Sequence, residues 1–420
     1  YKAYWDDGAQ VIEPHDKGII EEVNKVTSVK TMTKDEAISS GKLVLIDKEI
    51  DEPFWDMCKA QLFRPQLIKE KAKDVRIVYT PLHGTGAMHV EKVLGDLGLN
   101  ILTVPEQREP NGNFPTVEKP NPEEKPALTM AVELAKKEKA DGVMATDPDS
   151  DRFGTAFPDK DGNWVLLSGN QMGALLIDYI LLSRKEFNKM PANPAIIRSI
   201  VTSPFGDYIC KKYGVTMLDC LTGFKWIAAV EAAFEKDGSH NYVFGLEESY
   251  GYKVETEVMD KDGVSAAAMC AEMILYWRSQ GKSLLEHLDE LYKEFGYFED
   301  RSISQNFPGM SGVETMKNMM ASMRTNPPST LGGEKVVKVR DLMCDDKLPK
   351  SNVLQFYLES GTIVSARPSG TEPKIKFYIN SMVPAGNGTD AWLSEAKVQA
   401  GKLCDGITSD IQKIIDAASK

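Results

Sequence analysis

Hydrophobic residues in the first half of the chain alternate between short strand-like runs and longer helix-like patterns. A β-branched run at 75–80 is followed by apolar positions three or four residues apart from 90 to 97, the spacing of one helix face. A loop rich in Pro, Gly and Asn is expected at 105–122. Further strand, helix and strand patterns stand at 100–104, 128–135 and 142–146. Strands that alternate with helices of this length predict βαβ units and a largely parallel sheet.

A second set of α/β patterns begins after Asn188–Pro194, which contains two prolines and which we interpret as a linker. Its strand and helix patterns stand at 195–201, 204–213, 216–218, 223 onward, 242–244 and 263 onward. A different pattern follows Pro327, with strand-like runs at 336–339, 353–358, 363–367 and 375–379 and a helical stretch from 390. This last part predicts a smaller α+β domain with a mostly antiparallel sheet.

The predicted fold class is therefore a multi-domain α/β protein that ends in an α+β domain. We place the domains at 1–70, 71–190, 191–305 and 306–420. The first would be the remainder of an α/β domain with a linker helix. The start at Tyr1–Trp5 is typical of the middle of a strand, so we expect a segment that precedes it to be missing.

Composition excludes several classes of protein. The chain has 420 residues, which is too long for one core, and 42% hydrophobic and 27% charged residues are ordinary for a globular protein. A formal net charge of -12 argues against a nucleic acid or an anionic membrane as partner. No apolar run approaches the ~18 residues of a membrane span. Six cysteines without a C-x-x-C pair indicate reduced, mostly buried thiols and a cytoplasmic location.

Three aspartates at alternate positions follow the predicted strand 142–146: Asp147, Asp149 and Asp151. Carboxylates on one loop can converge on one hard cation, and oxygen ligands of this kind suit Mg²⁺. Arg152 comes next, and its fork-shaped guanidinium suits phosphoryl oxygens. The pattern predicts metal and phosphate chemistry. A polar turn without a metal is the alternative, although it would leave three carboxylates repelling one another.

Two other sites have a similar spacing. An EF-hand loop needs Gly at its sixth position and Glu at its twelfth, where this chain has Arg152 and Pro158. An aspartyl-nucleophile phosphatase also has Asp-x-Asp after a strand, but its fifth position is usually Thr or Val, and here it is Asp151. The residues at these neighbouring positions therefore disfavour both sites.

A second anion-binding pattern lies between the predicted strands at 363–367 and 375–379. Its loop combines two cations, two hydroxyls and a glycine: Arg367, Ser369, Gly370, Thr371 and Lys374. Gly370 frees the backbone to turn N–H groups toward an anion, and the side chains supply further donors. The loop predicts a phosphate cradle, with an ordinary hairpin turn as the alternative.

Weaker signals stand at other strand and helix ends. Glu247 and Ser249 can accept from and donate to neighbouring sugar hydroxyls, although a solvated acidic loop explains them equally well. Lys225 and Lys261 lie near helix starts, where anions are favoured, but each is more often a surface residue. For His83 we favour a structural role over a catalytic one.

Together these loops resemble the α-D-phosphohexomutase superfamily, above all its phosphoglucomutases, phosphomannomutases and related phospho-sugar mutases. The resemblance runs through essentially the whole chain and rests on four motifs in family order: Asp147-Pro-Asp-Ser-Asp-Arg152, Thr222-Gly-Phe-Lys225, Gly245-Leu-Glu-Glu-Ser249 and Arg367-Pro-Ser-Gly-Thr371. It implies three related α/β units and a C-terminal domain of a different fold, with the active site in the central cleft.

The resemblance also implies a role for each matching residue. Asp147, Asp149 and Asp151 would bind Mg²⁺, and Arg152 would contact the transferring phosphoryl group. Lys2 matches the lysine of the family's Asn-Gly-x-Lys segment, a proposed general acid or base, which needs a pKa near neutrality. The substrate-binding residues would be Gly223, Lys225, Glu247, Ser249 and Lys261, and those that grip the phosphate not being transferred would be Arg367, Ser369, Gly370, Thr371 and Lys374.

The implied function is interconversion of a hexose 1-phosphate and a hexose 6-phosphate, with glucose the expected sugar and mannose or pentose phosphates as alternatives. A phosphoserine would donate to the sugar and form a bisphosphate, which returns its other phosphate. In the family this serine stands in Ser-His-Asn-Pro, shortly before Asn-Gly-x-Lys, and no such sequence occurs in the 420 residues. We therefore expect a chain that begins after the serine and is inactive alone. A non-catalytic sugar-phosphate-binding protein and a phosphatase that uses Asp147 remain alternatives.

Overall fold

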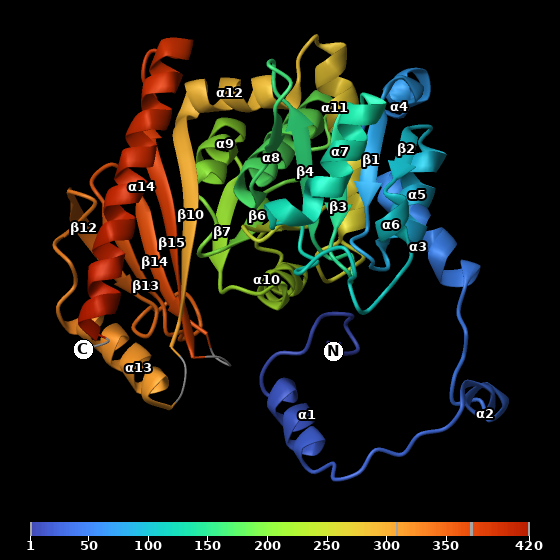
Figure 1. Cartoon of the computed structure of the whole chain (residues 1–420), viewed down its shortest axis with the longest axis horizontal. Helices are drawn as coiled ribbons and strands as arrows, with labels where there is room; N and C mark the ends of the chain where they lie inside the picture. The colour runs from blue at the N-terminus through green and yellow to red at the C-terminus, as the bar shows by residue number, and fades with distance from the viewer. Residues whose placement is uncertain (1, 308–309, 370–372, 419–420) are drawn as a thin grey trace.

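The computed structural model describes residues 2–307, 310–369 and 373–418, and it arranges their strands in three sheets that lie in a row (Figure 1). None of the helices in these ranges is both long enough and apolar enough to cross a membrane. The row runs from the first α/β unit through a second α/β unit to a C-terminal unit with a long covering helix.

The first sheet has the strand order β2-β1-β3-β4-β5. Its strands are β1 (Arg76–Thr80), β2 (Asn100–Thr103), β3 (Gly142–Thr146), β4 (Phe153–Pro158) and β5 (Trp164–Leu166). β1 is parallel to both neighbours, whereas β4 is antiparallel to β3 and β5. The prediction of a largely parallel sheet is therefore wrong for half of it. The reason is that loop 147–152 is too short for a parallel crossover, so it closes a hairpin.

The helices around this sheet are α3 (Lys48–Ala60), α4 (Pro65–Lys71), α5 (Gly86–Asp96) and α7 (Thr129–Glu138), with short turns η1 (Ala72–Asp74), α6 (Pro105–Arg108) and η2 (Lys125–Leu128). The apolar spacing predicted two of them, α5 and α7. On α5, Val90, Val93 and Leu94 have no exposed surface, which confirms the predicted helix face. The segment 105–122, predicted to be loop, begins with the single turn α6.

The second sheet has the order β7-β6-β8-β9, formed by β6 (Pro194–Ser199), β7 (Thr216–Cys220), β8 (Asn241–Glu247) and β9 (Gly251–Lys253). β6 is parallel to β7 and β8, and β9 folds back antiparallel on β8. Its helices are α8 (Gly169–Glu186), α9 (Phe205–Tyr213), α10 (Phe224–Asp237), α11 (Gly263–Ser279) and α12 (Leu284–Phe295). α11 contacts α5 of the first unit and α8 of the second, so it is apolar and buried on nearly every side.

The C-terminal sheet is antiparallel, with the order β10-β15-β14-β13-β12-β11. Its elements are β10 (Gly296–Asn306), α13 (Met310–Thr325), β11 (Thr330–Leu331), β12 (Glu334–Asp341), β13 (Leu354–Leu358), β14 (Ile363–Pro368), β15 (Lys374–Pro384) and α14 (Asp390–Ala418). The predicted antiparallel sheet and closing helix are confirmed. β10 pairs with β15 along its length, so residues 296–306 join this sheet, whereas the sequence prediction placed 296–305 in the third domain.

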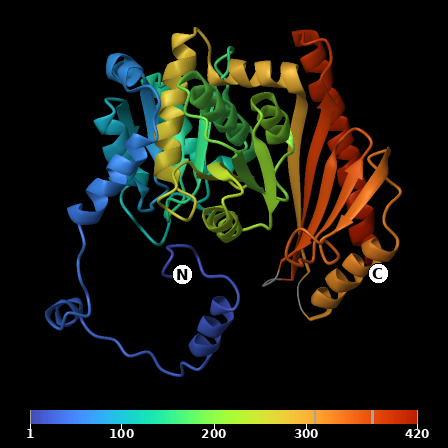
Figure 2. The same cartoon turned by 180° about the vertical axis from the view of Figure 1, so that it is seen from behind.

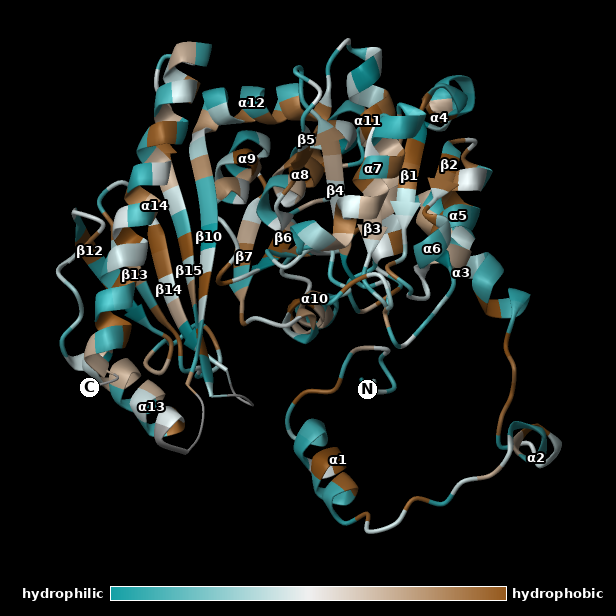
Figure 3. Cartoon of the chain, in the orientation of Figure 1, coloured by the Kyte–Doolittle hydropathy of each residue, from teal (hydrophilic) through white to brown (hydrophobic). Residues whose placement is uncertain are grey.

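The N-terminal segment carries α1 (His15–Asn24) and α2 (Lys34–Ser39), which lie away from the three sheets in both views (Figures 1 and 2). Figure 3 shows hydrophobic stretches along this segment. Apolar side chains in it are exposed, among them Val29 and Val44. The strand expected at Tyr1–Trp5 is wrong for the described part of it, where an isolated bridge between Tyr4 and Gln10 stands in place of a strand. Residues 2–5 nevertheless lie against the central units, where Lys2 contacts Asp151 and Tyr4 contacts Asp260.

Candidate active site

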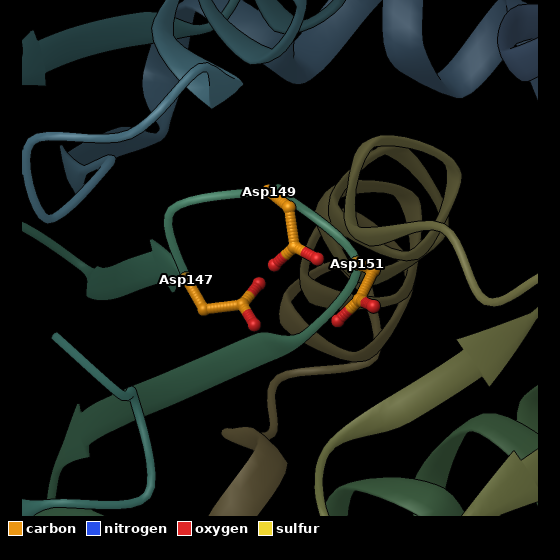
Figure 4. A group of neighbouring side chains, drawn as sticks. All are labelled: Asp147, Asp149 and Asp151. Carbon is orange, nitrogen blue, oxygen red and sulfur yellow. The ribbon is translucent and has the colours of Figure 1, made fainter. Parts of the chain in front are cut away.

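The three aspartates lie in the hairpin loop between β3 and β4, and their side chains converge (Figure 4). One carboxylate oxygen from each of Asp147, Asp149 and Asp151 lies within 4.8 Å of the others. Asp147 is buried and Asp149 is exposed. A group of three carboxylates that opens to solvent on one side suits a hard divalent cation that keeps water or substrate ligands.

Backbone contacts hold the hairpin loop 147–152, called the metal loop from here on, on two sides. Gly84 and Thr85 press against Pro148, and the Thr85 amide donates to the Pro148 carbonyl over 2.9 Å. On the other side the Gly263 amide, at the start of α11, donates to the Ser150 carbonyl over 3.0 Å. The loop is therefore positioned by the start of α5 in its own unit and by α11 in the next one.

Asp147 and Asp151 differ in how far nearby cations compensate their negative charge. Burial and the neighbouring charge of Asp151 raise the pKa of Asp147 to about 7. Burial acts in the same direction on Asp151, but the ammonium groups of Lys261 and Lys2 outweigh it and hold the pKa of Asp151 below its usual range. The Lys261 ammonium lies 3.3 Å from the Asp151 carboxylate. Because Asp147 lacks an equal countercharge, the donor set fits a bound cation.

Lys2 reaches the same loop from the N-terminal segment. Its ammonium donates to the Asp151 carboxylate and lies 3.4 Å from Asp149 and 3.8 Å from Asp260. Burial lowers the pKa of Lys2, but these carboxylates outweigh it and raise the pKa above its usual value. Lys2 is therefore a cation here. Its predicted acid–base role, which needs a pKa near neutrality, stays a prediction.

Arg152 lies between the metal loop and Glu123, with its guanidinium 3.6 Å from the Asp147 carboxylate. Its amide donates to Asp147 over 2.9 Å, and its guanidinium donates to Glu123 over 2.6 Å. Burial lowers the pKa of Arg152, but Glu123 and Asp147 raise it above its usual value. A guanidinium held this way beside the aspartates is in a position to meet a phosphoryl group.

The predicted sugar-binding loop is the hairpin between β8 and β9, directly beside the metal loop. The Phe153 amide donates to the Tyr250 carbonyl over 2.9 Å, and Arg152 forms a bridge with Gly251. Glu247 is buried and accepts from the Gly223 amide over 2.6 Å. Burial and the adjacent charge of Glu248 raise the pKa of Glu247 to about 7.

Three other predicted substrate-binding residues lie at the start of α10 (Gly223 and Lys225) and in the loop between β8 and β9 (Ser249). Lys225, at the start of α10, has its ammonium 3.8 Å from Asp16 of the N-terminal segment. Ser249 lies half-buried in the loop with Glu247. Gly223 has φ of 108°, a left-handed conformation that glycine adopts without strain. These placements keep Gly223 and Glu247 together and leave Lys225 facing the N-terminal segment.

The predicted phosphate cradle lies in the turn between β14 and β15 of the C-terminal sheet. Arg367 lies near Tyr378, where its charge opposes the burial that raises the pKa of Tyr378, and the Ser369 amide donates to the Lys374 carbonyl over 2.7 Å. Gly370 and Thr371 lie outside the described residues, so their part of the prediction stays untested. The turn's flanking strands pair in register, with Arg367 opposite Lys376.

A cavity of about 620 Å³ opens beside the metal loop. Lys2, Asp149, Asp151 and Lys261 line it, and so does Tyr4, whose hydroxyl donates to Asp260 over 2.7 Å. The sequence patterns predicted no role for Tyr4, Asp260 or Glu123, and none for Glu248, although it stands in the motif at 245–249. Asp260 directly precedes Lys261 and Tyr4 stands two residues after Lys2, which are weak signals, whereas nothing near Glu123 in the sequence indicates a site.

Comparison with known proteins agrees with this geometry. Residues 52–162 match the family model described as phosphoglucomutase/phosphomannomutase, alpha/beta/alpha domain II, and residues 168–295 match domain III. A Haemophilus influenzae protein named "Probable phosphomannomutase" is 37% identical over 400 residues, covering 94% of this chain and 77% of that protein. Mouse phosphopentomutase is 34% identical over 411 residues, covering 92% and 65%. A Staphylococcus haemolyticus phosphoglucomutase is 32% identical over 395 residues, covering 90% and 70%.

Solved structures agree on the fold. Parafusin, a phosphoglucomutase from Paramecium, superimposes with a TM-score of 0.61 at 17% identity, covering 88% of this chain and 62% of that one. A phosphoglucomutase/phosphomannomutase family protein from Burkholderia thailandensis gives a TM-score of 0.56 at 17% identity, covering 84% and 64%. At these identities the structures support the fold alone.

The fold and the site together define a phospho-sugar mutase architecture, with α/β units in series and a C-terminal antiparallel domain. The chain belongs to the phosphoglucomutase/phosphomannomutase family of the α-D-phosphohexomutase superfamily. It spans 65% of the mouse phosphopentomutase and 77% of the Haemophilus protein. The resemblance found in its four loop motifs is confirmed at the level of the family.

Proposed function

We propose that this chain carries the metal-, sugar- and phosphate-binding parts of a magnesium-dependent mutase that interconverts hexose 1-phosphate and hexose 6-phosphate. The observation that carries the proposal is the convergence of Asp147, Asp149 and Asp151 beside a cavity that Asp149, Asp151, Lys2 and Lys261 line. A cation bound by carboxylates, together with nearby ammonium groups, can position a phosphoryl group and stabilise the negative charge on it during transfer.

Each part has a distinct task in this proposal. Asp147, Asp149 and Asp151 hold Mg²⁺, which when bound neutralises charge on the transferring phosphoryl group. Arg152 meets that phosphoryl group, and Glu247 and Ser249 bind hydroxyls of the sugar. The further binding residues are Gly223, Lys225 and Lys261 around the sugar, and Arg367, Ser369, Gly370, Thr371 and Lys374 at the second phosphate. One cradle suffices because the substrate binds in two opposed orientations and presents either phosphate to it.

Glucose phosphate is the sugar we propose, with mannose and pentose phosphates as the competitors to test. Relatives of similar identity carry the names of all three activities. A carboxylate and a hydroxyl such as Glu247 and Ser249 can bind vicinal hydroxyls of any of these sugars. The choice therefore rests on measured affinities of this chain for the three phosphates.

Calorimetric titration of the chain tests the function through binding. We expect glucose 1-phosphate to bind at least about tenfold more tightly with Mg²⁺ than without it, because the phosphate then meets a neutralised loop. Asp149→Asn should weaken Mg²⁺ binding by at least about tenfold, since one charged ligand is lost. Asp161→Asn, at an exposed position away from the cluster, is the matched control and should bind as the unchanged chain does.

Turnover is followed in parallel as conversion of glucose 1-phosphate to glucose 6-phosphate with glucose 1,6-bisphosphate present. The 420 residues contain no Ser-His-Asn-Pro, so we expect binding without turnover. Turnover by this chain would contradict the need for that serine. Release of inorganic phosphate from glucose 1-phosphate would favour a phosphatase, and Mg²⁺-independent binding would contradict the proposed metal site.

A further inference from the structure

The loop that follows β6 contacts both the sugar-binding loop and the C-terminal sheet. This junction loop, Ser199–Ser203, begins with the last residue of β6 and makes two sets of contacts, one through the hydroxyls of Ser199 and Thr202 (the hydroxyl side) and one through the carbonyls of Ile200 and Val201 (the carbonyl side). Glu248, next to Glu247, accepts from the Ser199 hydroxyl over 2.8 Å and from the Thr202 hydroxyl over 3.4 Å. Ser199 and Thr202 are buried. The hydroxyl side therefore ties the junction loop to the sugar-binding hairpin.

The carbonyl side is held by two buried amides of the C-terminal sheet. Gln355 on β13 donates to the Ile200 carbonyl over 2.8 Å, and Asn380 on β15 donates to the Val201 carbonyl over 3.1 Å. Both amide side chains are almost fully buried, so each contact excludes water. A buried donor that loses its acceptor stays unsatisfied, which makes such contacts specific in geometry.

One of these strands, β15, begins at the phosphate cradle, and the other, β13, pairs with β14, which ends there. Gln355 also donates to Ser365 on β14 over 3.1 Å, two residues before Arg367. On β15, Tyr378 lies two residues before Asn380 and pairs across the sheet with Ser365, two residues before Arg367. Tyr378 packs against Ile200 and Val201 in one apolar cluster. Contacts between a few side chains thus connect the junction loop to the sugar-binding loop and to the strands that flank the phosphate cradle.

We propose that Glu248, Gln355 and Asn380 are positioning residues that set the separation of the sugar-binding loop and the phosphate cradle through the junction loop. The proposal rests on the proposed function for the roles of those two loops. A sugar phosphate has its hydroxyls and its phosphate at a set distance, so it binds well only when both loops are held at that distance. Inorganic phosphate needs the cradle alone.

Calorimetry on the chain with Mg²⁺ separates these two ligands. In the double variant Gln355→Met with Asn380→Leu, which keeps the volume but removes the donors, we expect about tenfold weaker binding of glucose 1-phosphate. The affinity for inorganic phosphate should stay within about twofold. Thr362→Val, which removes a buried hydroxyl that accepts from the Met382 amide within the C-terminal unit, controls for a general loss of stability. It should leave both affinities as they are.

A distance measurement tests the positioning without any ligand. Spin labels at Lys236→Cys on α10 and Lys402→Cys on α14 stand at exposed positions, and Cys344→Ser removes the exposed thiol while the remaining free cysteines described are buried. We expect one narrow distance distribution in the labelled parent and a broadened one in the double variant. An unchanged width, or an equal loss of both affinities, would overturn the proposal. If the unchanged chain binds no glucose 1-phosphate, the proposed function fails, and the distance distribution still decides the positioning role.

Discussion

At the scale of single residues, the structure contains buried acids outside the proposed site whose protonation bears on stability. Glu255, after β9, has no exposed surface and lies near Asp262, the residue that caps α11. Burial and the charge of Asp262 raise the pKa of Glu255 to about 8. A carboxyl with a raised pKa holds its proton more tightly in the folded chain than in the unfolded one.

This pKa predicts how stability changes with pH. Because the unfolded pKa is near 4.3, the proton on Glu255 stabilises the folded chain below that pH, and this contribution is lost as pH rises to about 8. Glu255→Gln cannot ionise, so its free energy of unfolding should fall less between pH 5 and pH 8, by about 3.5 kcal/mol. Urea unfolding at several pH values measures this. Glu235→Gln, at an exposed position, should follow the unchanged chain, and an equally steep fall in Glu255→Gln would contradict the account.

At the scale of elements, the metal loop depends on a close backbone approach from the start of α5. A β-carbon at Gly84 would lie 2.3 Å from the Pro148 α-carbon and 2.5 Å from its carbonyl oxygen. Backbone atoms at this distance cannot yield as a flexible side chain can. The motif Gly84-Thr85-Gly86 is therefore part of the metal site, although it binds no metal itself.

Gly84→Ala should displace Pro148 and with it the aspartates on either side. We expect a loss of about 2 kcal/mol in the free energy of unfolding and at least about tenfold weaker Mg²⁺ binding. Gly95→Ala is the matched control on α5, since no atom lies within 4 Å of its β-carbon position. It should raise stability by up to about 1 kcal/mol, because alanine favours helix. Thermal unfolding and Mg²⁺ titration give both quantities, and unchanged Mg²⁺ binding in Gly84→Ala would contradict the account.

At the scale of the whole molecule, the two α/β units share one buried polar joint. Glu272 on α11 accepts from the amides of Phe63 and Arg64, over 3.0 and 2.5 Å, and from the Tyr179 hydroxyl over 2.9 Å. The Arg64 guanidinium in turn donates to Tyr179 and to Ser183 on α8. The joint connects the segment before α4 with two central helices, so we expect the units to unfold together.

Glu272→Leu should destabilise the molecule by about 3 kcal/mol, because the buried amides of Phe63 and Arg64 and the Tyr179 hydroxyl lose their acceptor. Urea unfolding followed by tryptophan fluorescence measures the change. Glu133→Leu, at an exposed position of α7, is the control and should stay within about 0.5 kcal/mol of the unchanged chain. A loss below about 1 kcal/mol in Glu272→Leu would show that the joint carries little stability.

Local patterns in the sequence determined most of the elements and the chemistry of the loops. Period-3.6 and β-branched runs report which face of a segment is buried, so they predicted α5, β1 and the antiparallel C-terminal strands. The three aspartates could be recognised because all the ligands stand on one short loop. Strand pairing was harder to predict. β4 turned back on β3, and β10 joined the C-terminal sheet, because pairing depends on loop length and on distant partners.

Only the tertiary structure decided which charges meet. Lys2 and Asp151 are 149 residues apart in sequence, and they are in contact because the first residues of the N-terminal segment lie beside the metal loop. The opposite pKa shifts of Asp147 and Asp151 likewise follow from burial and from the position of Lys261, which no spacing in the sequence encodes. The sequence by itself determined the kinds of groups in the site. Their partners, burial and protonation depend on contacts between distant segments, because electrostatic energies depend on distance and solvent exclusion.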